Sequence, residues 1–274
     1  MQTSSTGVSR TRQVVAAVIG NALEWYDFIV YGFLASIIAR QFFPSEDEYA
    51  SLLMALATFG VGFFMRPVGG ILLGMYSDRK GRKAAMQMII RLMTVSIALI
   101  AFAPNYAAIG MGAPLLIVVA RMLQGFATGG EYASATAFLV ESAPAHRKGL
   151  YGSWQLVGQC LAVFSGAGMV ALFTHLLTPE ALDSWGWRIP FMIGLLIGPV
   201  GLWIRKHMEE PEEFLEARKQ AKGESPGLLQ VIREHRRAIL VSMGLACGAT
   251  VSFDVVLVSM PTFAHKNLGL PLDQ

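Results

Sequence analysis

Three stripes of polar side chains run through segments that are otherwise apolar, and their residue types could handle protons and bind anions. In the first of these segments Asn21, Glu24, Asp27 and Tyr31 recur at spacings of three, three and four. This spacing places them along one face of an α-helix. A carboxylate in a medium of low dielectric takes up a proton more readily than it does in water. Glu24 and Asp27 are therefore the candidate proton-coupling residues.

A second stripe lies much later in the chain, where Arg121, Gln124, Thr128 and Glu131 recur at spacings of three, four and three. Arg121 is the natural counter-charge for Asp27, and a guanidinium also binds a substrate carboxylate through two hydrogen bonds. We interpret Arg121 as a residue of both proton coupling and substrate binding. A permanent structural ion pair is the alternative, and Glu131 could equally brace its helix.

A third stripe of Tyr151, Gln155 and Gln159 has the same helical spacing. A charged side chain that faced lipid would cost several kcal/mol, so we expect the three stripes to face one another around a hydrated cavity. The substrate-binding candidates on these stripes are Asn21, Tyr31, Arg121, Gln124 and Gln155.

The composition explains what must position these stripes. Of 274 residues, 54% are hydrophobic and only 15% are charged, whereas a soluble domain carries about 25% charged residues. The apolar residues form seven blocks near the ~20 residues that a membrane-spanning helix needs. They are too long and continuous for barrel strands, so the sequence predicts an all-α integral membrane protein. The expected helices are 14–39, 51–76, 84–103, 113–139, 150–177, 187–204 and 238–263.

The loop charges predict the topology. Most of the 22 Lys and Arg residues fall in alternate connections, which places the N-terminus and these connections in the cytoplasm. The net charge of +3 is too small to favour nucleic acid as a partner. The expected parts are a cytoplasmic N-terminus (1–13), a six-helix transmembrane bundle (14–204), an amphipathic cytoplasmic linker (205–237), a seventh transmembrane helix (238–263) and an extracytoplasmic tail (264–274).

A ten-residue motif lies between the second and third expected helices: Gly74-x-x-x-Asp78-Arg79-x-Gly81-Arg82-Lys83. Gly74 lets helices approach closely, and Gly81 allows a tight turn. Asp78 is expected at the start of the third helix, where the helix dipole favours a negative charge. We interpret the motif as a gating element of the cytoplasmic side.

The motif resembles the signature of the major facilitator superfamily, and further stretches resemble its metabolite:proton symporter family. Members of that family carry citrate, tricarballylate, 2-oxoglutarate, shikimate, or proline and betaine. Segments 42–48 and 153–155 are similar to the citrate and tricarballylate carriers. The stretches that carry the resemblance are 20–28 (GNALEWYDF), 65–70 (MRPVGG), 121–131 (RMLQGFATGGE), 141–149 (ESAPAHRKG) and 185–191 (WGWRIPF).

The resemblance implies the N-terminal six-helix bundle of a twelve-helix fold plus a seventh helix, in a multi-pass protein of a bacterial-type inner membrane. It implies proton symport of a small organic acid, a di- or tricarboxylate such as citrate, by alternating access. Protons are the coupling ion, and we expect no cofactor, metal or enzymatic activity. Lipids and a missing C-terminal bundle are the implied partners. The alternatives are symport of an osmolyte (proline or betaine) or of shikimate, and a non-transporting fragment.

Three charged residues and three tryptophans need separate interpretation. Arg66 is expected in a gating role, either snorkelling to the surface or pairing with Glu141. Arg91 lies where the family usually has a small or apolar residue, and it either pairs with a carboxylate inside the bundle or is a defect. Asp254 has no obvious basic partner in this chain, and either its partner belongs to the missing helices or it reaches the outer interface. Three tryptophans are interpreted as packing or interfacial anchors, namely Trp154, Trp187 and Trp203.

Overall fold

The computed structural model describes residues 10–206, 210, 214–216 and 228–253, and every regular element among them is helical. The chain divides into two units, 1–222 and 223–274, and each is described by itself. Four described helices are long and apolar enough to cross a membrane, or six if each of two bent pairs counts as one span. The expected all-α membrane fold is confirmed.

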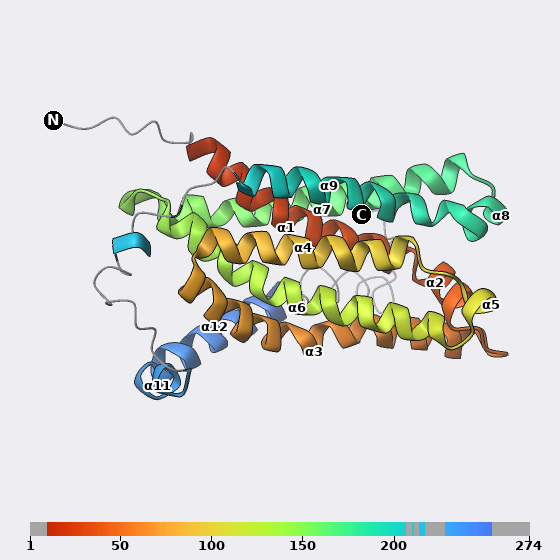
Figure 1. The fold of residues 1–274 in the computed structure, drawn as a ribbon, viewed down its shortest axis with the longest axis horizontal. Helices are drawn as coiled ribbons and strands as arrows, with labels where there is room; N and C mark the ends of the chain where they lie inside the picture. Colours follow the sequence, from red (N-terminus) through yellow and green to blue (C-terminus); the bar gives the residue numbers. More distant parts are fainter. Residues whose placement is uncertain (1–9, 207–209, 211–213, 217–227, 254–274) are drawn as a thin grey trace, which may run out of the picture. The chain divides into compact units, whose positions relative to one another are not determined.

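Six long helices make up most of the described part of the first unit (Figure 1). Along them α3 packs against α6, α1 packs against α7, and α4 packs against both α6 and α9. The elements in chain order are α1 (Arg10–Phe33), α2 (Ala35–Phe42), α3 (Glu48–Lys80), α4 (Arg82–Ala101), α5 (Tyr106–Ile109), α6 (Gly112–Glu141), the 3-10 turn η1 (Ala145–Arg147), α7 (Lys148–Leu176), α8 (Pro179–Ala181), the π-helical η2 (Leu182–Gly186) and α9 (Arg188–Lys206).

The first expected span is bent rather than straight. The axes of α1 and α2 differ by 69°, with the break at Leu34. The bend lets α2 bury Ile38 and Phe42 completely. The Phe42 ring meets Trp187 edge-on at 5.5 Å between centroids. Burial of this short amphipathic helix explains why the chain turns at Leu34, inside the apolar run 14–39 that was predicted to be one helix.

Helices α3 and α6 touch through their backbones. A Cβ atom on Gly125 of α6 would fall onto the carbonyl group of Gly62 in α3, and one on Gly69 of α3 would fall onto the carbonyl of Phe126. Small residues permit such close approach between spanning helices. The contact fixes the polar stripe of α6 against α3, and this positions the site described below.

The second unit contains α11 (Leu228–Glu234) and α12 (Arg236–Phe253). Helix α11 falls within the expected cytoplasmic linker, and α12 overlaps the expected seventh helix as far as residue 253. Residues 254–263 of that helix, with Asp254, and the expected tail 264–274 lie outside the described residues.

Candidate functional site

A buried ion pair joins α1 to α6 in the first unit. Arg121 Nη1 donates to Asp27 Oδ2 at 3.1 Å, and the two side chains are only 2% and 1% exposed. Gln124, one turn further along α6, donates from Nε2 to the same Asp27 oxygen and accepts from Arg121 Nη1. The structure therefore brings together three of the candidate residues from two of the predicted stripes.

The Arg121 guanidinium is held by aromatic faces and keeps unused donors. Its carbon lies 3.6 Å from the centre of the Tyr31 ring and 5.8 Å from that of Phe59, a cation–π arrangement that holds the group in place. Within the described part of the chain, Arg121 Nε, Arg121 Nη2 and Asp27 Oδ1 have no hydrogen-bond partner. A buried polar atom without a partner costs free energy, so these atoms suit the binding of a polar ligand.

A second charged cluster lies beside this pair. Glu24 is 4% exposed, and its carboxyl group bonds the Thr128 side chain and lies close enough to Arg66 and Glu131 for electrostatic interaction. Glu131 is completely buried. Glu24 Oε2 has no hydrogen-bond partner among the described residues. The two clusters thus bring together three carboxyl groups and two guanidinium groups of the described residues, contributed by α1, α3 and α6.

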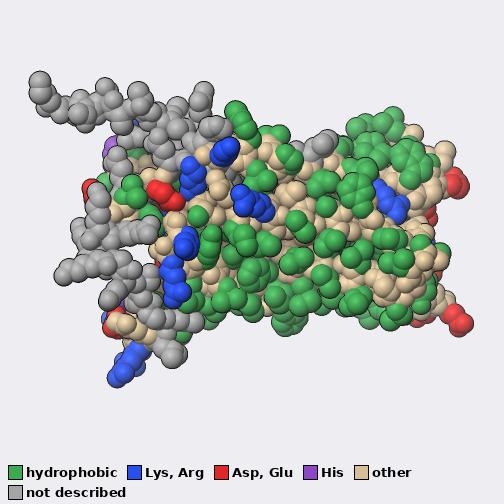
Figure 2. Space-filling view, viewed as in Figure 1, with side chains coloured by type: hydrophobic (Ala, Val, Ile, Leu, Met, Phe, Trp, Pro, Cys, Tyr) green, Lys and Arg blue, Asp and Glu red, His purple; other side chains and the backbone are tan. Residues whose placement is uncertain are grey.

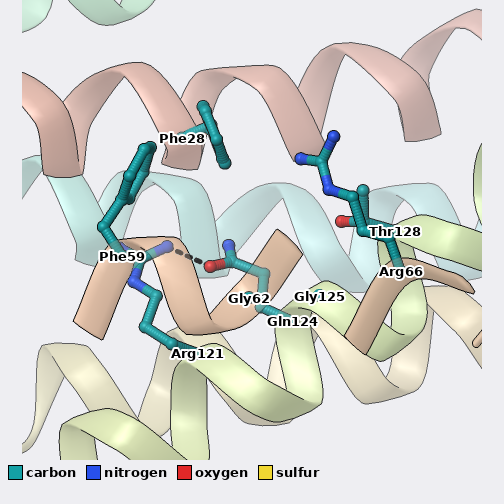
Figure 3. A pocket seen from close by; sticks show the side chains of 8 residues that line it. All are labelled: Phe28, Phe59, Gly62, Arg66, Arg121, Gln124, Gly125 and Thr128. Atoms are coloured by element: carbon teal, nitrogen blue, oxygen red, sulfur yellow. Dashed lines mark hydrogen bonds between the residues drawn. The ribbon is translucent and has the colours of Figure 1, made fainter. Parts of the chain in front are cut away.

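A small pocket separates the two arginines. Its volume of about 10 Å³ is close to the room that one water molecule needs. Figure 3 shows Arg121 and Arg66 at opposite ends of the pocket, with Gln124 between them. The two arginine side chains therefore border one space. The lining residues are Phe28, Phe59, Gly62, Arg66, Arg121, Gln124, Gly125 and Thr128.

The remaining substrate-binding candidates bond to backbone oxygens or to Thr136. Asn21 donates to the backbone oxygen of Gln155 at 2.8 Å, and the Gln155 amide oxygen accepts from Thr136 at 2.5 Å. Tyr31 donates from its hydroxyl to the carbonyl of Ala55 at 3.2 Å. These contacts tie α1 to α7 and α3. Tyr31 touches the arginine of the site through its ring, whereas Asn21 and Gln155 lie outside the pocket lining.

The gating motif is arranged differently from the sequence prediction. Asp78 was expected at the start of a helix, but α3 continues to Lys80, so Asp78 lies in its last turn. The chain turns at Gly81, whose φ of 111° favours glycine. Asp78 instead accepts from Arg82 Nη1 at 2.5 Å. The prediction was wrong because the helix break lies after the acidic residue rather than before it.

Arg82 also takes the partner that was considered for Arg66. Arg82 bonds Glu141 through two nitrogens, at 3.3 and 3.1 Å. Arg66 lies over the rings of Phe28 and Phe63, at 5.1 and 4.5 Å from their centres. The pairing of Arg66 with Glu141 is therefore wrong, and Arg66 belongs to the pocket. Gly74 lies in α3, where an added Cβ atom would meet no described residue within 4 Å, so the expected close helix approach is not found there among the described residues. Arg79 is exposed.

The sequence interpretation missed Glu210, which supplies the negative charge at the start of α4. Its two carboxylate oxygens accept from the backbone N–H groups of Arg82 and Lys83, at 2.9 and 3.0 Å. The ring of Phe214 lies 4.8 Å from the Arg82 guanidinium. Proximity to the motif could not be inferred from a charge-rich segment so distant in sequence.

A larger groove of about 430 Å³ lies between α2 and the start of α3. Arg40, Glu48 and Tyr49 contribute to its wall. None of the buried polar residues described above lines it, and its one buried polar lining residue is Ser51. The chemistry of the unit is therefore concentrated in the smaller pocket.

Comparison with known proteins decides the family. The model of the sugar (and other) transporter family matches residues 13–262. The chain belongs to this family. Its membership confirms the predicted resemblance to the major facilitator superfamily. Among solved structures, the xylose transporter XylE from E. coli in a partially occluded inward-open conformation aligns with a TM-score of 0.70 and 19% identity, over 78% of this chain and 52% of that one. At this identity the likeness shows the shared fold.

The names of curated relatives of this chain refer to different substrates. A proline/betaine transporter of Salmonella typhimurium is 38% identical, with 94% of this chain and 53% of the relative covered. A citrate-proton symporter of Klebsiella pneumoniae is 37% identical, with 97% and 60% covered. A shikimate transporter of Escherichia coli (strain K12) is 36% identical, with 96% and 61% covered. The chain spans little more than half the length of these relatives.

Proposed function

We propose that this chain forms the N-terminal half of a proton-coupled symporter for a small organic acid with two or more carboxylate groups, citrate being one example. The observation that carries the proposal is that Arg121 of α6 and Arg66 of α3 border one pocket. At about 10 Å³ this pocket has room for one water molecule, so the proposal requires that it opens during transport, when each guanidinium binds a carboxylate of the same molecule. The names of the citrate and shikimate relatives support an organic acid.

The aromatic side chains argue against an osmolyte such as betaine. A quaternary ammonium group is bound by the open faces of aromatic rings. Arg66 lies over the rings of Phe28, which lines this pocket, and of Phe63, and Arg121 lies over the ring of Tyr31. The rings therefore hold the protein's own cations, and a ligand cation would have to displace them. This favours an anion, although a proline/betaine transporter is among the relatives.

Proton coupling is proposed to operate through the Asp27–Arg121 pair, with Glu24 beside it. While Asp27 is ionised it holds Arg121; when a proton neutralises Asp27, the guanidinium is released to the substrate carboxylate. The two six-helix halves of the complete transporter would then rock about this site. By the distribution of Lys and Arg, the connection between α3 and α4 is on the cytoplasmic side of a bacterial plasma membrane.

Uptake by the complete transporter tests the proposal. This chain, completed by the C-terminal half of the Klebsiella citrate-proton symporter, is reconstituted in vesicles with an imposed proton gradient. Labelled citrate, 2-oxoglutarate, shikimate and betaine are compared. Accumulation of citrate or 2-oxoglutarate that collapses with the proton gradient supports the proposal. Accumulation of betaine alone, or of no compound when the parent symporter is active, would overturn it.

The isolated chain is expected to bind carboxylates only weakly. The second half of the cavity wall, which the family supplies from the C-terminal bundle, is not part of the described unit. Calorimetry with purified chain should therefore detect no citrate binding at micromolar concentrations. Tight binding would show that this half alone completes a site.

A further inference from the structure

The two acidic residues of α1 are each matched with an arginine of another helix. Asp27 pairs with Arg121 of α6. Glu24, one turn before Asp27 on the same face, interacts more strongly with Arg66 of α3 than with any other charged group. Each acid also keeps one buried carboxylate oxygen without a hydrogen-bond partner among the described residues. Both acids therefore have a free oxygen that can take up a proton.

Helix α6 binds the two acids in the same way, one turn apart. Gln124 donates to Asp27, and Thr128, four residues later, bonds Glu24. The two acid sites are thus about 6 Å apart along α6. Both arginines border one pocket, whereas neither acid lines it, and Figure 3 shows Thr128 beside Arg66. A substrate that enters the opened pocket therefore meets the guanidinium groups and not the carboxylates.

Few other charges reach this interior. Two charged groups act on Glu24 from other helices, Arg66 of α3 and Glu131 of α6. The described buried residues of α2, α4 and α7 carry no charge, and α9 has charges only at its ends. Arg91 of α4 is exposed and makes no hydrogen bond or ion pair among the described residues, so its expected pairing with a carboxylate inside the bundle is wrong. The charge around Glu24 is therefore set by α1, α3 and α6.

The surroundings make an added charge costly. Figure 2 shows mostly hydrophobic side chains over the middle of the face in view, with Lys and Arg gathered toward one end. A charge that is buried without a partner in such a medium costs free energy. A substrate with two carboxylates brings two negative charges into the interior. Its entry is favourable only if two negative charges of the protein are neutralised at the same time.

We propose that the complete transporter carries two protons with each dicarboxylate dianion, one on Asp27 and one on Glu24, so that the loaded cycle moves no net charge across the membrane. A proton on Asp27 releases Arg121 to one substrate carboxylate, and a proton on Glu24 releases Arg66 to the other. Both protons bind from the side on which the substrate enters and leave with it on the opposite side. Each guanidinium exchanges a protein carboxylate for a substrate carboxylate, so the total charge of the interior is conserved.

This inference rests on the proposed function and adds to it the number of protons and a second exchange site at Glu24 and Arg66. Glu131 lines no part of the pocket and keeps one protonation state throughout the cycle.

The test uses the complete transporter, in which this chain is joined to the C-terminal half of the Klebsiella citrate-proton symporter. The substrate is labelled 2-oxoglutarate, whose two carboxylates are both ionised at neutral pH. The membrane potential of the vesicles is held at zero with equal potassium on both sides and valinomycin. Each coupled proton contributes about tenfold accumulation per unit of pH gradient, so we expect about a hundredfold for the native transporter and about tenfold for Glu24→Gln. Glu24→Asp should keep the two-proton dependence.

An inside-negative membrane potential gives a second measurement. It should leave accumulation by the native transporter unchanged, because the loaded cycle carries no net charge. Glu24→Gln and Asp27→Asn each carry one uncompensated negative charge inward, so the potential should oppose them and cancel the gain from the remaining proton. Glu131→Gln is the matched control, since it removes another buried carboxyl group of the same cluster, and it should behave as the native transporter does.

The outcomes separate this inference from the proposed function. A one-proton dependence in the native transporter, or an equal dependence in the native and Glu24→Gln transporters, would overturn the inference and leave the proposed function intact. Loss of one proton in Glu131→Gln instead of Glu24→Gln would overturn the assignment to Glu24. A transporter that accumulates no dicarboxylate would overturn the proposed function itself.

Infrared difference spectroscopy of the purified full chain decides the same point without transport. The C=O stretching signals of protonated carboxyl groups are compared between alkaline and acid pH. Asp27→Asn and Glu24→Gln should each remove one signal from the difference spectrum of the native chain, and Glu131→Gln should remove none. An unchanged spectrum in Glu24→Gln would show that Glu24 takes up no proton, and it would overturn the inference even where this variant transports too slowly to measure.

Discussion

Arg121 on α6 and Asp27 on α1 meet at 3.1 Å in the interior of the bundle, yet each keeps polar atoms without a partner among the described residues. A purely structural ion pair would be expected to satisfy all its donors and acceptors, because a buried pair is stable only with additional hydrogen bonds. The unused guanidinium nitrogens are therefore available to a second anion. This arrangement makes the pair the first target for mutation.

Asp27→Asn tests the coupling role. The amide keeps the shape of the side chain but carries neither a proton nor a charge, so it can no longer compete for Arg121. In the complete transporter we expect substrate exchange to continue and proton-driven accumulation to be lost, measured as labelled uptake with and without a proton gradient. Asp183→Asn, in an exposed pair with Arg40, should leave accumulation intact. Normal proton dependence in Asp27→Asn would contradict the assignment.

Arg121→Gln tests the energetics of the same pair. It leaves Asp27 buried without its counter-charge, which costs about 3–5 kcal/mol in comparable cases. The double variant Asp27→Asn with Arg121→Gln should recover most of this loss, because no charge then remains unpaired. Thermal unfolding of the purified chain measures the loss of stability in the single variant and its recovery in the double variant. Equal destabilisation in the single and double variants would show that packing, and not charge, determines the effect.

The packing of α3 on α6 gives a third prediction. Gly125→Ala places a methyl group on the carbonyl of Gly62, so the helices must separate, and we expect a loss of about 1–3 kcal/mol in the free energy of unfolding. Gly60→Ala is the matched control on α3, since nothing lies within 4 Å of the added carbon. That variant should be neutral or slightly stabilising. Similar melting temperatures for the two variants would contradict the close contact.

The contact between Glu210 and the start of α4 gives a fourth prediction. Glu210→Gln removes the negative charge that accepts from the N–H groups of Arg82 and Lys83. Loss of a helix cap costs about 1 kcal/mol, so hydrogen exchange at these two amides should become about fivefold faster. Glu216→Gln changes an exposed residue of the same charge-rich segment and serves as the control. Unchanged exchange in Glu210→Gln would show that the carboxylate does not cap the helix.

The sequence was sufficient to predict the helices and the buried polar faces, because each depends on local periodicity. Asn21, Glu24 and Asp27 are all less than 5% exposed, as a stripe facing the bundle interior requires. The expected limits of α4 and α6 also lie within about two residues of the observed ones. The length of an apolar run and the spacing of its polar residues are properties of one segment. Helix limits and buried faces can therefore be predicted from that segment alone.

Partners between segments could not be predicted in the same way. Glu141 was considered for Arg66, but it bonds Arg82, because the order of charges along the chain does not give the rotation of each helix about its axis. The contact of Glu210 with the gating motif depends on the path of the chain after α9, which is distant in sequence from the motif. The exposure of Arg91 likewise depends on which face of α4 meets α6 and α9.

The balance of charge in the interior gives the last prediction. Among the described residues, the carboxyl groups of Asp27, Glu24 and Glu131 cluster with the guanidinium groups of Arg66 and Arg121, so these five groups together carry one excess negative charge when all are ionised. Such a charge is costly in a low dielectric. Glu24→Gln should therefore raise the melting temperature of the isolated chain at neutral pH, although it removes a coupling candidate, whereas Arg66→Gln should lower it. Glu141→Gln, at the Arg82 pair outside this interior, should not raise it. A lower melting temperature for Glu24→Gln at neutral pH would mean that its charge is required for stability, and that the interior is balanced in the resting state by a proton on one of the other two carboxyl groups.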